Sequence, residues 1–133
     1  EPILVQMTDA KRISKASKIF CLIGSVFLLL MGAFHGSGFF YVSEAIQKSN
    51  AEDFLKDIVP ALFAHPSIHL IGLAVLGILA LFLKEDIRKL TWALAVLVFI
   101  DALLGFYLGG PIPGLLLTIA ALCFVVSGYK SPN

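Results

Sequence analysis

Charged side chains are scarce in this chain. Lys, Arg, Asp and Glu make up 14% of its 133 residues, whereas soluble proteins contain about 25%. Hydrophobic residues reach 59%, and the mean hydropathy is +0.94. This composition excludes an ordinary soluble domain and is typical of a membrane protein. The net charge of +1, with no basic stripe beyond a short N-terminal run, excludes nucleic acid as a partner.

Cysteine and known catalytic motifs are also sparse. The two cysteines, Cys21 and Cys123, lie in separate apolar runs without CxxC or metal-type spacing, so we predict that both are buried core residues. The sequence contains no HExxH motif, no glycine-rich phosphate loop and no serine nucleophile elbow. It therefore assigns no catalytic residue and leaves open whether the protein is an enzyme.

Long apolar runs dominate what is present. Four of them, at about 19–42, 66–83, 90–108 and 112–128, have the length of about 20 residues that a membrane span requires. In hydrocarbon each must be a helix, because a helix satisfies its own backbone polar groups. The sequence thus predicts an all-α fold, a single up-down bundle of four transmembrane helices over residues 1–133. Residues 1–6 precede Met7, and we expect them to be an expression remnant.

The distribution of positive charge predicts the orientation. Eight of the ten Lys and Arg residues precede the first run, lie between the second and third, or follow the fourth. Only Lys48 and Lys56 lie on the other side. The positive-inside rule therefore places both termini of this multi-pass membrane protein in the cytoplasm.

The connection between the first two runs is long enough for structure of its own. Ser49-Asn50-Ala51-Glu52 has the spacing of a helix capping box. Apolar residues then recur at helical spacing in 54–62, opposite charged ones. This pattern predicts a short amphipathic helix on the outer membrane surface. Pro66 predicts that the second span begins there as a separate helix.

Ionisable side chains inside the spans are few. Asp101 is the only acidic residue in any run, and His35, His65 and His69 are the only histidines. At about 1.5 Å per residue, His35 and Asp101 lie about 10 Å from the outer ends of their spans and His69 about 5 Å inside its own. The four residues are thus predicted to share one outer layer. Such residues are costly in hydrocarbon and are candidates for function.

Small residues predict which faces of the spans meet. Gly32 and Gly36 flank His35, and Gly105 and Gly109 follow Asp101 at helical spacing. Because small residues let helix backbones approach closely, these faces should contact other helices. His35 and Asp101 should then point toward the bundle interior.

Several chemistries suit this layer. His35, His69 and Asp101 are candidate metal ligands, because imidazole and carboxylate bind transition metals, and His65 is a further candidate ligand-binding residue. Two histidines from different helices are also compatible with a haem iron, and a histidine–aspartate pair with proton relay. The same groups could instead only hydrogen-bond across helices. These alternatives stay open.

Two segments carry a resemblance to a known group of proteins. They are His35-Gly36 in the first run and Phe63-Ala64-His65-Pro66-Ser67-Ile68-His69 at the start of the second. The chain resembles small uncharacterised four-helix proteins of the bacterial inner membrane, some called DoxX-like. The resemblance implies a four-helix bundle of mostly unassigned function, with DoxX relatives linked to quinone-dependent oxidation as accessory subunits. No DoxX signature carries that activity onto particular residues here.

Three functional hypotheses follow. The first is a small binding module that holds a metal, haem or small ligand in an outer pocket of His35, His69 and Asp101. The second is a structural accessory subunit of a larger redox or transport complex. The third is a proton-coupled carrier or channel subunit, which at 133 residues would require a homo-oligomer. In each case the lipid bilayer is the first partner.

The orientation can be tested by cysteine labelling. In a background with Cys21 and Cys123 replaced by alanine, Lys48→Cys should react with an impermeant thiol reagent in intact cells. Lys130→Cys should react only after lysis, because we predict it on the cytoplasmic side. Labelling of position 130 in sealed cells would overturn the predicted orientation.

Overall fold

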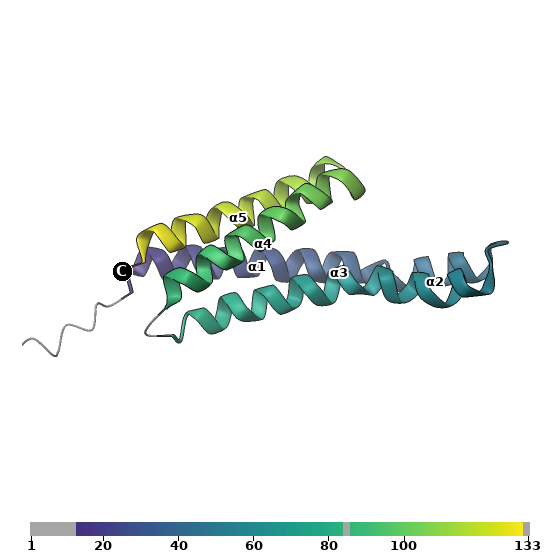
Figure 1. Cartoon of the computed structure of the whole chain (residues 1–133), viewed down its shortest axis with the longest axis horizontal. Coiled ribbons are helices and arrows are strands. Elements are labelled where there is room, and N and C mark those ends of the chain that lie inside the picture. Colours follow the sequence, from purple (N-terminus) through teal and green to yellow (C-terminus); the bar gives the residue numbers. More distant parts are fainter. Residues whose placement is uncertain (1–12, 84–85, 132–133) are drawn as a thin grey trace, which may run out of the picture.

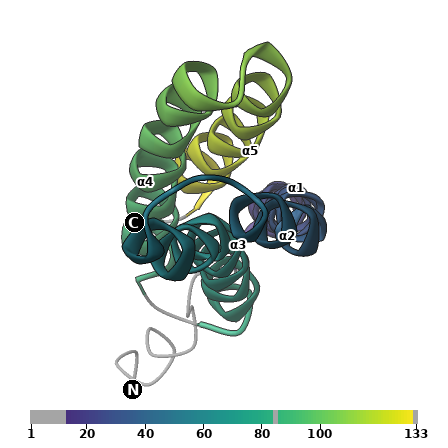
Figure 2. The ribbon, with the colours of Figure 1, turned by 90° about the vertical axis from the view of Figure 1, so that its right-hand side faces the viewer.

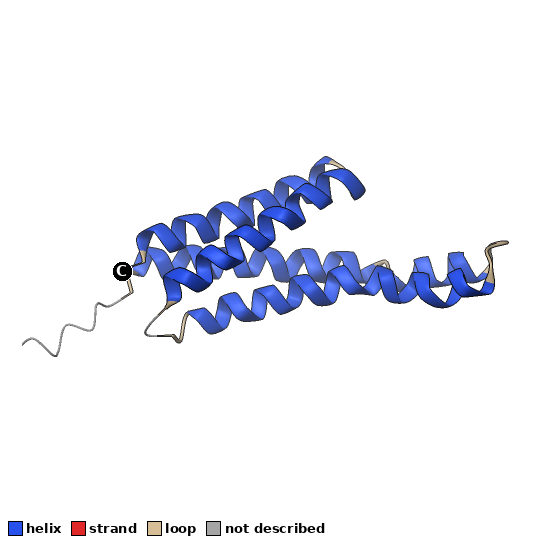
Figure 3. Cartoon of the chain, in the orientation of Figure 1, coloured by secondary structure: helices blue, strands red, loops and turns tan. Residues whose placement is uncertain are grey.

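All regular elements of the described chain are helices. The computed structural model describes residues 13–83 and 86–131, and nothing is described of residues 1–6 or of Lys84. The described residues form five helices (Figures 1 and 3): α1 Lys15–Ser37, α2 Phe39–Gln47, α3 Asp53–Ala80, α4 Ile87–Leu108 and α5 Pro111–Lys130. The all-α prediction is confirmed for these residues.

Four segments are long and apolar enough to cross a membrane. They are α1 together with α2, then α3, α4 and α5. The predicted runs 90–108 and 112–128 fall inside α4 and α5. The prediction of four membrane-crossing helices is therefore confirmed, on length and composition.

The second span differs from its prediction. α3 runs from Asp53 to Ala80 through Pro60 and Pro66, so the prediction of a separate surface helix ending before Pro66 is wrong. A proline inside a helix usually costs about 3 kcal/mol, because its ring clashes with a carbonyl and its N–H is missing. α3 nevertheless continues through both prolines, and side chains of α1 and α2 bond carbonyl groups of α3 near them, as described below.

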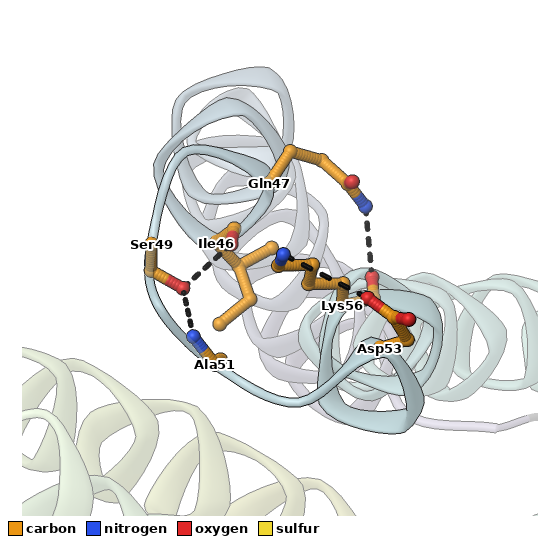
Figure 4. A network of polar contacts seen from close by, with 6 residues as sticks. All are labelled: Ile46, Gln47, Ser49, Ala51, Asp53 and Lys56. Carbon is orange, nitrogen blue, oxygen red and sulfur yellow. Dashed lines mark hydrogen bonds and ion pairs between the residues drawn. The ribbon is translucent and has the colours of Figure 1, made fainter.

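The predicted capping box is also wrong. Glu52 is the N-cap residue of α3, and no side chain caps that end. Ser49 instead donates a hydrogen bond from Oγ to the Ile46 carbonyl (2.7 Å) and accepts one from the Ala51 N–H (3.2 Å), as Figure 4 shows. Ser49 therefore closes the end of α2.

The helices differ in length. At about 1.5 Å per residue, the 28 residues of α3 extend about 42 Å, against about 33 Å for the 22 of α4 and about 30 Å for the 20 of α5. α2 and the first turns of α3 therefore extend beyond the end of the α4–α5 pair (Figure 1). We call residues 39–62 the protruding hairpin, and the opposite end of the bundle, where α1 begins and α5 ends, the base.

α1 is the central helix of the bundle. It packs on α3 on one side and on α5 on the other, while α4 packs mainly on α5 and only slightly on α3. The α1–α3 pair and the α4–α5 pair lie together at the base and diverge toward the protruding hairpin (Figures 1 and 2). The bundle is thus closed at the base and open at the other end.

A buried serine network joins α1 to α5 at the base. Ser17 Oγ donates to the Ser127 carbonyl, Ser127 Oγ donates to the Ser17 carbonyl, and Ser131 Oγ donates to the Ser127 carbonyl, each at 2.9 Å. Ser14 caps α1 by accepting from the Ser17 N–H and donates to the Lys130 carbonyl. Because each hydroxyl has a carbonyl acceptor, burial leaves none of these protons unpaired.

Glycines bring the helix backbones together. Gly32 and Gly36 of α1 pack on the Ser67 turn of α3, and Gly105 of α4 packs on Gly114 of α5. This confirms the faces predicted from small residues.

Cys21 and Cys123 are buried, as predicted, and both are free thiols. Cys21 Sγ donates to the Gly77 carbonyl at 3.1 Å.

Two glycines of α3 provide a matched test of this close packing. A Cβ at Gly77 would overlap Ser25 Oγ and lie 3.1 Å from the Phe124 ring, whereas a Cβ at Gly72 would meet nothing within 4 Å. Gly77→Ala should lower the free energy of unfolding by about 1–3 kcal/mol through overpacking. Gly72→Ala should leave it unchanged or raise it by up to about 1 kcal/mol. Unfolding in mixed micelles measures both, and equal effects would contradict the packing described.

Candidate functional site

His35 is bound to α3. Its ring stacks on that of Phe63, with ring centroids 4.4 Å apart, and its Nε2 lies 3.0 Å from the Phe63 carbonyl oxygen. A carbonyl can only accept a hydrogen bond, so Nε2 must carry the proton. The neutral ring then has Nδ1 as an unprotonated acceptor.

The position of His35 is related to the prolines of α3. Pro66 has no N–H, so the helix lacks the bond that would end on the carbonyl four residues before it. The His35 bond reaches the carbonyl of Phe63, in the same turn. Pro60 likewise frees the Lys56 carbonyl, and Gln47 Nε2 of α2 donates to that oxygen at 3.1 Å (Figure 4). Gln47 thus satisfies the carbonyl that Pro60 frees, whereas His35 bonds the carbonyl next to the one that Pro66 frees.

His69 and Asp101 form a second polar contact, between α3 and α4. His69 Nε2 lies 3.1 Å from Asp101 Oδ2, and the two side chains are 39% and 17% exposed. The bond crosses between two helices that otherwise pack only slightly on each other. The ring of His65, which is exposed, lies nearly parallel to that of His69, with centroids 6.3 Å apart.

The predicted layer is therefore divided into two groups. His69 and Asp101 meet, with His65 beside them, whereas His35 bonds to Phe63 instead. Over residues 13–83 and 86–131, no three His, Cys, Asp or Glu side chains are grouped so that they could hold a metal ion. The structure does not assemble His35, His69 and Asp101 into one ligand set. Their depths were similar, but depth along a helix does not fix the face.

An apolar cavity of about 950 Å³ lies at the open end of the bundle. It is bounded by the last turns of α1, by Phe63 of α3, and by the turn between α4 and α5 with the first turns of α5. Its lining residues are Phe27, Leu30, Met31, Phe34, His35, Ser37, Gly38, Phe63, Gly109, Pro111, Ile112, Pro113 and Leu116. Of the predicted site residues, only His35 belongs to this set.

The tight α4–α5 turn forms one edge of the cavity. Gly110 has φ +86° and ψ −167°, a conformation that is essentially restricted to glycine. α5 begins directly after it at Pro111, where a proline is well suited because the first N–H groups of a helix have no intrahelical partner. Sequence reasoning treated this segment only as a turn. The cavity depends on the angle between two helix pairs, for which the sequence has no local signal.

Comparison of the chain with family models, with curated proteins and with solved structures finds no match.

A double-mutant cycle tests the His69–Asp101 contact. With His69→Leu and Asp101→Leu, we expect a coupling energy of about 0.6 kcal/mol, and at most about 1.7, as for other hydrogen bonds between membrane helices. His65→Leu combined with Asp101→Leu is the control and should show no coupling, because His65 forms no bond to Asp101 in the described chain. Unfolding in mixed micelles gives all the energies. Equal coupling in the two cycles would refute a specific bond.

Proposed function

We propose that this protein is a membrane-embedded binding protein that holds a small lipophilic ligand in the cavity beside His35. The observation that carries the proposal is the cavity itself. Its volume of about 950 Å³ falls within the range of about 300–1,000 Å³ that is usual for ligand sites. Its lining is mostly apolar with few polar groups, which is also typical of such sites.

The ligand would enter from the bilayer. Phe34 and Ile112 line the cavity and are 78% and 71% exposed, so the cavity wall is continuous with the apolar outer surface of the bundle. A molecule dissolved in the membrane could therefore reach the cavity without crossing water.

The residues favour a small lipophilic ligand over a metal or haem. His35 is the only His, Cys, Asp or Glu in the cavity lining. One of its two nitrogens bonds to Phe63, which leaves a single nitrogen for a metal. Stable metal sites in proteins use several such ligands.

The proposal also includes the orientation of the protein in the membrane and its relationship to a known group of proteins. Lys15, Lys18 and Lys130 lie at the base, and the protruding hairpin carries four carboxylates against two lysines. This asymmetry supports cytoplasmic termini in a bacterial inner membrane and a cavity in the outer half of the bilayer. The two histidine-containing segments support a relationship to the DoxX-like proteins.

Two neighbouring leucines of α5 provide the test. Leu116 lines the cavity, whereas Leu115 is exposed and does not. A diazirine derivative of hexadecane should label cavity residues of the wild-type protein in nanodiscs. Leu116→Trp should abolish that labelling by filling the space, and Leu115→Trp should not.

Peptide mapping by mass spectrometry locates the label. Wild-type labelling spread evenly over all lipid-facing helix surfaces would mean that the cavity is not a binding site.

A further inference from the structure

We infer that the ligand is a neutral long-chain amphiphile whose polar group donates hydrogen bonds, such as a long-chain alcohol or a monoacylglycerol. This inference rests on the proposed function and specifies the class of ligand. It follows from the charge, the shape and the hydrogen-bonding state of the cavity lining.

The charge of the lining excludes ionised head groups. Among the residues that the structure describes, no Lys, Arg, Asp or Glu side chain lines the cavity. A carboxylate, phosphate or ammonium group would enter without an opposite charge, and burying an unpaired charge is strongly unfavourable. The head group should therefore be neutral.

The shape indicates an elongated molecule with a fixed direction. The lining extends along α1 from Phe27 to Gly38, a rise of about 16 Å at about 1.5 Å per residue. The part nearer the base contains Phe27, Leu30 and Met31, and the part nearer the protruding hairpin contains His35 and Ser37. The apolar tail should thus point toward the base and the head toward the protruding hairpin.

The two polar side chains of the lining are both acceptors. His35 donates its Nε2 proton to the Phe63 carbonyl, which leaves Nδ1 as an acceptor. Ser37 donates its only hydroxyl proton to the Phe34 carbonyl at 2.6 Å, which leaves lone pairs on Oγ. Each proton is committed to a backbone carbonyl, so neither side chain has a proton for the ligand.

The opposite wall adds few donors. Of the three lining residues in the first turn of α5, Pro111 and Pro113 have no N–H, and only Ile112 has one. The cavity is therefore richer in acceptors than in donors. A hydroxyl group fits it, because a hydroxyl donates and also accepts, whereas an ester or ketone only accepts.

Competition against a photolabel tests the ligand class. A diazirine derivative of hexadecanol is bound to the wild-type protein in nanodiscs, and unlabelled hexadecanol, methyl palmitate and palmitate are added as competitors of equal chain length. Hexadecanol should compete about fivefold to tenfold better than methyl palmitate, because one net hydrogen bond contributes about 1 kcal/mol. Palmitate should compete least at neutral pH.

Two variants link that selectivity to the named atoms. Ser37→Ala removes one acceptor without changing the His35–Phe63 bond, and His35→Phe removes the other while keeping an aromatic ring against Phe63. In each variant the ratio of hexadecanol to methyl palmitate affinity should fall toward one. A ratio that is unchanged in both would show that these atoms do not select the head group.

The outcomes separate the two proposals. If hexadecanol and methyl palmitate compete equally for cavity labelling in the wild type, the ligand class is wrong and the binding function stands. If palmitate competes best, the inference of neutrality is wrong. If no probe labels the cavity, the binding function fails and the ligand class fails with it.

Discussion

A helix in hydrocarbon must satisfy its backbone polar groups within the protein, and α3 depends on this constraint more than any other described element. Pro60 and Pro66 each remove a backbone donor. Gln47 of α2 reaches the carbonyl that Pro60 frees, and His35 of α1 reaches a carbonyl in the turn of Pro66. The first bond joins the two helices of the protruding hairpin, and the second joins α1 to α3 just beyond it. The second bond also gives His35 a structural role and fixes its proton on Nε2.

Small residues pack α1 closely on α5 and α3 near the base, and large side chains surround the cavity at the other end. Serines and glycines join α1 to α5 and α3 near the base, with hydroxyls bonded to backbone carbonyls. Toward the protruding hairpin, α1 presents Phe27, Leu30 and Phe34, and α5 begins with Pro111 and Pro113. These larger side chains surround a cavity instead of closing it. Tight packing at the base therefore holds the two helix pairs at the angle that leaves this space.

Much of the fold could be predicted from the sequence, and much less of the site. Apolar length identified four membrane-crossing helices, and Gly32 and Gly105 identified contact faces, because both signals are local. Pro66 led to a wrong prediction of where α3 begins. The side chain that bonds α3 beside Pro66 is His35 of α1, and the sequence around Pro66 does not show that contact. Counting residues placed His35 at the depth of Asp101 but could not show that α1 turns it toward Phe63. The cavity depends on an interhelical angle, which no single segment encodes.

The unequal helix lengths have a consequence for how any ligand would be measured. α4 and α5, at about 33 and 30 Å, match a hydrocarbon core of about 30 Å, whereas α1 with α2 continues well past it. α1 with α2 therefore extends past the ends of α4 and α5 (Figure 1), and the cavity lies beside those ends. In a bilayer, lipid chains would approach the cavity from the side. The relevant concentration of a ligand is then its mole fraction in the leaflet, so occupancy should follow membrane composition and stay insensitive to dilution of the aqueous phase.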